Sequence, residues 1–308
     1  MNRIAYIFPG QGAQYVGMGQ DFYDTFQESK TVFEKASSIL GMDMEELIFK
    51  DKHRLNMTQF TQIAMVTTCM AQVSVVNNLG IRPDVCAGLS LGEYPALMTC
   101  GVMSFEEGLS VVRKRGLYMD TALPPGYSTM AAVIGLSGEE VLKACNKTDE
   151  RVTVANYNCP GQVVITGENK GIEKLSKSLK EMGARRIIPL KVSGAFHSPL
   201  LEGAGKKFLE SLKGVTIHNP KIPYVSNVTG EYVYDNSTIK DLLSKQVYSP
   251  VLWQQSVEKM IDSGIDTFIE IGPGKTLSSF VKKINSTCKL INVDKVKDLE
   301  RLQEVIDA

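Results

Sequence analysis

The chain is organised around Asp84-Val85-Cys86-Ala87-Gly88-Leu89-Ser90-Leu91-Gly92-Glu93-Tyr94. An apolar run that ends in small residues predicts a buried strand, and the segment that follows predicts a helix. Gly88 and Gly92 permit a sharp turn between the two, a nucleophile elbow that would expose the hydroxyl of Ser90 at the carboxyl edge of a sheet. The start of the following helix would offer main-chain N–H groups to a developing oxyanion.

The elbow pattern alone is weak evidence, because G-x-S-x-G arises by chance in roughly one chain in ten of this length. A serine hydroxyl needs a neighbouring base, and the chain has only three histidines. His197 lies in a Gly/Ser/Pro-rich loop, where functional residues are common. His53 lies in a charged stretch and His218 precedes Asn-Pro at a strand entry, so we interpret both as solvated or structural. The residues alone favour His197 as the base without deciding it.

Composition excludes several classes of protein. Of 308 residues 43% are apolar, which suffices for a large core, and 34 basic residues balance 34 acidic ones. No global field therefore attracts nucleic acid or an anionic membrane, and no apolar run is long enough to span a bilayer. The chain opens on a strand without a basic leader, so we expect a cytoplasmic protein. Six cysteines show no metal-ligand spacing, so we expect reduced thiols and no metal.

Two lobes are expected from the order of elements. After Leu123-Pro124-Pro125-Gly126 the pattern becomes β-α-β-β-α-β, the order of a ferredoxin-like unit. We predict an α/β fold in which residues 1–126 and 194–308 form an α/β-hydrolase-like large subdomain with a parallel sheet. Residues 127–193 would form the inserted ferredoxin-like small subdomain.

Two further stretches bear on the site. Phe8-Pro9-Gly10-Gln11-Gly12 ends a strand in a tight loop, but Tyr15 replaces the third glycine of a dinucleotide fingerprint. A helix expected from Phe105 to about Met119 carries Arg113 and Arg115, which flank its buried stripe about equally. Periodicity does not choose between these two arginines.

Six motifs together resemble, in order and spacing, those of malonyl-CoA:acyl carrier protein transacylases. They are Phe8-Pro9-Gly10-Gln11-Gly12, Gly88-Leu89-Ser90-Leu91-Gly92-Glu93-Tyr94, Arg115-Gly116, Asn158-Cys159-Pro160-Gly161-Gln162, Ala195-Phe196-His197 and Glu270-Ile271-Gly272-Pro273-Gly274. The resemblance covers nearly the whole chain. It implies an acyltransferase of fatty acid biosynthesis that moves a malonyl group from malonyl-CoA to the phosphopantetheine thiol of holo acyl carrier protein, through a malonyl-serine. The implied partner is an acidic carrier protein, with no nucleic acid, no membrane and no metal or redox cofactor, and the enzyme is expected to be a monomer.

The resemblance also implies roles for individual residues. Ser90 would be the nucleophile, His197 its base, and Arg115 the group that grips the malonyl carboxylate through a planar fork. The other implied contributors are the backbone N–H groups of Gln11 and Leu91 as the oxyanion hole, Phe196 and Asn158 as substrate contacts, and the backbone carbonyl of Leu252 as the group that orients the base. Phe196 in Ala-Phe-His is also typical of malonyl rather than methylmalonyl transfer. The family often has histidine where this chain has Leu89, although the turn itself depends only on the backbone.

Three alternatives stay open from the sequence. A discrete acyltransferase of a polyketide assembly line would use the same chemistry with a different carrier. A serine thioesterase or esterase would share Ser90 and His197 but would not need Arg115. A non-catalytic carrier-binding module is disfavoured because both reactive residues are intact.

Overall fold

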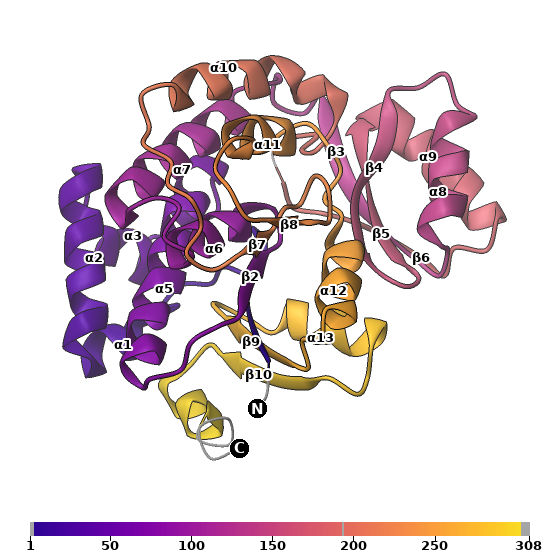
Figure 1. The fold of residues 1–308 in the computed structure, drawn as a ribbon. Coiled ribbons are helices and arrows are strands. Elements are labelled where there is room, and N and C mark those ends of the chain that lie inside the picture. Colours follow the sequence, from indigo (N-terminus) through magenta and orange to yellow (C-terminus); the bar gives the residue numbers. More distant parts are fainter. Residues whose placement is uncertain (1–2, 193, 303–308) are drawn as a thin grey trace.

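The structure, a computed structural model, describes residues 3–192 and 194–302. It has two lobes (Figure 1): a large lobe built on a six-stranded sheet, and a small lobe, residues 128–189, built on a four-stranded sheet. The small lobe is an insertion in the large one, because helices of the large lobe precede and follow it in the chain. Within the described ranges, no helix has both the length and the apolar composition needed to cross a bilayer.

The large sheet brings the ends of two strands together at its centre. The strand order is β10-β9-β1-β2-β7-β8, and every neighbouring pair is parallel except β7 with β8. The strands are β1 (Ile4–Phe8), β2 (Val85–Gly88), β7 (Tyr224–Val225), β8 (Tyr232–Val233), β9 (Thr267–Ile271) and β10 (Lys289–Val293). Because Phe8 pairs with Gly88 at the carboxyl ends of β1 and β2, the loops that follow these strands meet at one edge.

Helices cover both faces of this sheet, as a parallel sheet requires. Alternate residues of β1 enter two separate cores: Tyr6 and Phe8 pack with residues of α5 and α7, and Ala5 and Ile7 pack with residues of α12 and α13. The helices and 3-10 turns of the large lobe are α1 (Gln20–Thr25), α2 (Gln27–Leu40), α3 (Met44–Phe49), α4 (Lys52–Leu55), α5 (Thr58–Asn78), η1 (Ser90–Gly92), α6 (Glu93–Thr99), α7 (Phe105–Asp120), η2 (Pro199–Leu201), α10 (Glu202–Leu212), α11 (Ile239–Gln246), α12 (Trp253–Asp262), α13 (Thr276–Ile284) and η3 (Val296–Leu302).

The small lobe confirms the ferredoxin-like expectation. Its elements are β3 (Ser128–Ile134), α8 (Gly138–Asn146), β4 (Val152–Cys159), β5 (Gln162–Glu168), α9 (Asn169–Glu181) and β6 (Arg186–Pro189), with antiparallel strand order β4-β5-β3-β6. One face of the sheet packs on α8 and α9, and the other presents Met130, Ala132 and Val164 to the large lobe. The α/β fold class predicted from the sequence is therefore confirmed. The predicted subdomain boundary at residue 193, like residues 1–2 and 303–308, lies outside the described residues.

Candidate active site

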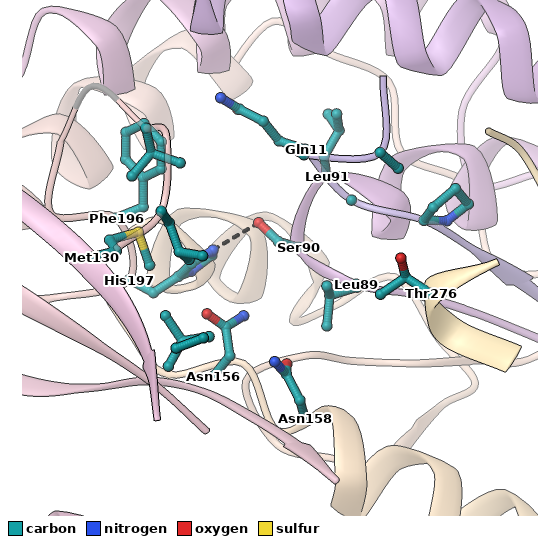
Figure 2. Close-up of a pocket in the computed structure, with 18 of the residues that line it drawn as sticks. Gln11, Leu89, Ser90, Leu91, Met130, Asn156, Asn158, Phe196, His197 and Thr276 are labelled. Carbon is teal, nitrogen blue, oxygen red and sulfur yellow. Dashed lines mark hydrogen bonds between the residues drawn. The ribbon is translucent and has the colours of Figure 1, made fainter. Parts of the chain in front are cut away.

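A cavity of about 260 Å³ lies between the two lobes and contains Ser90 (Figure 2). The large lobe contributes the loop after β1, the elbow after β2, and the segment that carries His197. The small lobe contributes side chains from the inner face of its sheet, among them Met130, Asn156 and Asn158, which Figure 2 shows around the same space as the Ser90 hydroxyl. The site therefore forms where the two lobes meet.

The elbow is tight enough to require both of its glycines. A Cβ on Gly88 would lie 2.0 Å from the carbonyl carbon of Gly92, and a Cβ on Gly92 would lie 2.0 Å from the carbonyl oxygen of Phe8. Ser90 has a φ of 53°, in the left-handed region that a side chain rarely adopts. The amide of Asn227 pins this strained turn, since its Oδ1 accepts from Ser90 N (2.6 Å) and its Nδ2 donates to Gly88 O (2.7 Å).

The side chains of His197 and Ser90 lie within hydrogen-bonding distance of each other. Its Nε2 lies 2.7 Å from Ser90 Oγ, the contact dashed in Figure 2, and its Nδ1 lies 2.7 Å from the main-chain carbonyl of Gln246. A carbonyl can only accept, so Nδ1 carries the proton and Nε2 is left to accept from the hydroxyl. His197 also has a positive φ, 59°, and its main-chain N donates to Val247 O at 3.1 Å. The end of α11 thus holds both the backbone and the ring of this residue.

The imidazole is buried, and this determines its protonation. Burial, with a further contribution from the charge of Arg115, lowers the pKa of His197 to about 3. The ring is therefore neutral at physiological pH, which is the form that can take a proton.

The expectation that Leu252 orients the base is wrong. The carbonyl of Leu252 instead accepts from the main-chain N (2.9 Å) and the Oγ (2.7 Å) of Ser256, in the first turn of α12. Gln246 is the last residue of α11, and the last carbonyls of a helix have no partner within it. Its carbonyl is therefore available to the ring, and the proline at 250, just beyond the helix, was the available sequence signal for such an end.

Arg115 is the arginine that faces the site. Its side chain is buried, and its Nη2 donates to Ser90 Oγ and to Gln246 Oε1, both at 3.0 Å, while its Nη1 donates to Gln62 Oε1 at 2.8 Å. Arg113 is exposed and donates to Leu40 O. In the described part of the chain the Arg115 guanidinium thus donates its hydrogen bonds to two neutral amides and a hydroxyl. Burial lowers the pKa of Arg115 because the charged guanidinium is poorly solvated.

The other residues expected at the site also line the cavity. Gln11 and Leu91 lie on the two loops that meet at the sheet edge, and Gln11 Nε2 anchors the first loop by donating to Thr58 Oγ1 at 3.1 Å. Phe196 and Asn158 line the cavity from the histidine loop and from β4, and Asn158 Oδ1 is buried without a hydrogen-bond partner among the described residues.

Sequence reasoning missed four polar residues around the serine. Gln62, Glu93, Asn227 and Gln246 are each at most 1% exposed and form hydrogen bonds to Arg115, to the elbow or to one another. The signal for Gln62 was a glutamine inside an apolar helix, since such a side chain needs a buried partner. In residues 3–192 and 194–302, no cluster of three or more His, Cys, Asp or Glu side chains could hold a metal ion.

Similarity to known proteins agrees with this arrangement. The model of the acyl transferase domain family matches residues 5–300. The malonyl CoA-acyl carrier protein transacylase of Bacillus subtilis (strain 168) is 43% identical over 304 residues, covering 97% of this chain and 96% of the relative. The crystal structure of the transacylase of that name from Clostridium perfringens ATCC 13124 has a TM-score of 0.96 and 45% identity, covering 99% of this chain and 97% of that one.

A third protein was solved with a partner. It is a malonyl-transacylase in complex with a holo type II PKS acyl-carrier protein, with a TM-score of 0.96 and 35% identity, covering 99% of this chain and 100% of that one. In each comparison the match spans almost the full length of both chains. The chain belongs to the malonyl-CoA:acyl carrier protein transacylase family.

Proposed function

We propose that this acyltransferase moves a malonyl group from malonyl-CoA to the phosphopantetheine thiol of an acyl carrier protein through a malonyl-serine intermediate. One observation carries the proposal: Ser90 Oγ lies 2.7 Å from His197 Nε2 and 3.0 Å from Arg115 Nη2 in one cavity. A nucleophile, its base and a buried guanidinium suit an acyl chain that ends in a negative charge, since among the described residues this guanidinium hydrogen-bonds to no carboxylate.

In the first half-reaction Ser90 Oγ attacks the thioester carbonyl while His197 takes the hydroxyl proton. The main-chain N–H groups of Gln11 and Leu91 are the proposed donors to the oxyanion. The intermediate collapses with cleavage of the carbon–sulfur bond, and the imidazolium returns its proton to the departing thiolate of CoA. The carbonyl of Gln246 stabilises the imidazolium in the meantime, in place of the acid of a serine triad.

In the second half-reaction the thiol of the carrier enters the emptied cavity. His197 takes the thiol proton, the thiolate attacks the malonyl ester, and the proton passes to Ser90 Oγ as the carbon–oxygen bond breaks. The enzyme returns to its starting state, so the cycle is ping-pong. Every proton and charge is handled by residues of the chain, and we therefore propose that no metal or redox cofactor takes part.

Arg115 supports selection for malonyl groups in two ways. A carboxylate can form two charge-assisted hydrogen bonds with the guanidinium fork, which an acetyl group cannot form. The same carboxylate competes for the Nη2 proton that Ser90 Oγ now accepts, and so frees a lone pair of the nucleophile. Phe196 and Asn158 would border the bound acyl group, since both line the cavity.

The setting of the reaction is also a proposal. We place the protein in the cytoplasm, because all six of its cysteines are free, as is typical of a reducing compartment. We propose that it acts as a monomer, since one chain supplies the whole site, and that its pathway is fatty acid biosynthesis. Delivery to a polyketide carrier is a second candidate, favoured by the similarity to the malonyl-transacylase solved with a type II PKS carrier. Transfer rates to carriers of both kinds separate the two.

Incubation with malonyl-CoA followed by intact mass measurement and peptide mapping tests the proposal. We expect a malonyl adduct on Ser90 that persists until a holo carrier protein is added and then appears on the carrier. A Ser90→Ala variant should form no adduct. An adduct on another residue, or release of free malonate at the same rate without a carrier, would contradict the transferase reading, and the second result would indicate a thioesterase.

A further inference from the structure

We infer that Glu93 is a positioning residue that sets the preference for malonyl groups by fixing the side chain of Gln246 against Arg115. The inference rests on the proposed function and adds a residue that contacts neither the substrate nor the reacting atoms. It concerns a buried carboxylate that the reaction cycle itself does not use.

Glu93 is the first residue of α6, three positions after the nucleophile, and only 1% of its surface is exposed. Its Oε2 accepts from Gln246 Nε2 (2.5 Å) and from Asn227 N (3.3 Å), while its Oε1 is buried without a hydrogen-bond partner among the described residues. A buried carboxylate with one unsatisfied oxygen is a poor contributor to stability. Its contact with the support of Arg115 gives a functional reason for its position.

The chemistry of the carboxylate determines which way the Gln246 amide points. Burial raises the pKa of Glu93 to about 7, so the variants are compared at pH 8, where the carboxyl group is ionised. A carboxylate only accepts hydrogen bonds, so the NH₂ of Gln246 must face Glu93. The other N–H of the same group donates to the main-chain oxygen of Ser90 at 2.9 Å. The amide oxygen is then left facing Arg115 Nη2, at 3.0 Å. The opposite orientation would bring two donors together and would push the guanidinium away.

Gln246 has separate contacts with the two groups that the reaction uses. Its side chain holds Arg115, whereas its main-chain carbonyl holds the ring of His197. Glu93 also accepts from the main-chain N of Asn227, whose side chain holds the elbow, so the informative change is Glu93→Gln, which keeps an oxygen for that N–H. In this variant the change acts on the side chain of Gln246 and leaves its carbonyl in place. Loss of the carboxylate should therefore impair recognition of the malonyl carboxylate and spare the serine–histidine pair.

The test compares kcat/KM for malonyl-CoA and for acetyl-CoA in Glu93→Gln and Glu93→Met. In Glu93→Gln a neutral amide replaces the carboxylate and can itself turn its NH₂ toward the oxygen of Gln246. We expect the ratio of the two kcat/KM values to fall about five- to tenfold, which is the difference between a charge-assisted and a neutral hydrogen bond. Glu93→Met removes the acceptor, so the fall in the ratio should be larger. The rate for acetyl-CoA should be retained in Glu93→Gln, whereas Glu93→Met also removes the acceptor of Asn227 N and can lower both rates.

Two further variants distinguish positioning from general damage. Glu270→Gln changes another fully buried glutamate, which caps α13 through Leu277 N and Ser278 N; it should lower the melting temperature and leave the ratio unchanged. In an Arg115→Ala background, Glu93→Gln should have no further effect on the ratio, because its target is gone.

The outcomes separate this inference from the function on which it rests. An unchanged ratio in folded Glu93→Gln and Glu93→Met, or an equal loss for both thioesters in Glu93→Gln, would overturn the positioning role. A persistent effect of Glu93→Gln in the Arg115→Ala background would do the same. Failure of the unmodified protein to form a malonyl adduct on Ser90 would instead remove the proposed reaction, whatever the variants do.

Discussion

Arg115→Ala should lower kcat/KM for malonyl-CoA without lowering it for acetyl-CoA, so the preference for malonyl groups should be lost. The guanidinium offers a malonyl carboxylate two charge-assisted bonds, each worth about 1.5–3 kcal/mol. Part of this is offset, because Nη2 must give up its present bond to Ser90 Oγ. A net loss of about 3 kcal/mol corresponds to a fall of roughly a hundredfold in kcat/KM for malonyl-CoA. Acetyl-CoA never forms these bonds, so its rate should stay level or rise.

The assay measures free CoA, separated from the carrier protein, after reaction of each thioester with holo carrier protein. Arg113→Ala is the matched control, since it removes an exposed arginine from the same helix, two residues away, whose contact is the carbonyl of Leu40. It should leave the preference for malonyl-CoA unchanged. If Arg115→Ala kept the full preference, or if Arg113→Ala lost it equally, the guanidinium would not be the group that selects the substrate.

Two other predictions concern stability. Because burial lowers the pKa of His197 to about 3, the unfolded chain, with a pKa near 6.5, takes up this proton first as the pH falls. Between pH 8 and pH 5 the free energy of unfolding, measured by denaturant titration, should therefore drop by about 2 kcal/mol more in the unmodified protein than in His197→Gln. An equal pH dependence of the two proteins would refute this. Gly92→Ala places a Cβ 2.0 Å from Phe8 O and should lower the free energy of unfolding by about 3 kcal/mol or more. Gly203→Ala in α10 places a Cβ with nothing within 4 Å and should not destabilise the protein. Similar melting temperatures for the two variants would contradict the elbow geometry.

Local patterns predicted much of the fold because they depend on neighbouring residues. The apolar run before Ser90 and the small lobe's alternation of strands and helices both form the elements that their periodicity indicates. The choice between Arg113 and Arg115 could not be made in this way. Both flank the stripe of α7, and only packing against α5 and the elbow shows which one is buried.

The support of the histidine was beyond local patterns for a similar reason. Whether the carbonyl of Leu252 or that of Gln246 reaches the ring depends on where α11 ends and α12 begins. Element boundaries are the least certain part of a sequence-based assignment. The cluster of Glu93 with Gln246 joins residues 153 positions apart, and no periodicity records such a pairing.

The two lobes divide the site in a way that matters for engineering. Ser90 and His197, which we propose exchange protons, belong to the large lobe, whereas Met130, Ala132 and Val164 line the same cavity from the sheet of the small lobe. A combinatorial library confined to these three positions would therefore resize the compartment for the acyl chain without altering the serine–histidine geometry. Acceptance of branched or longer acyl donors then depends on the side chains that the small lobe presents to the cavity.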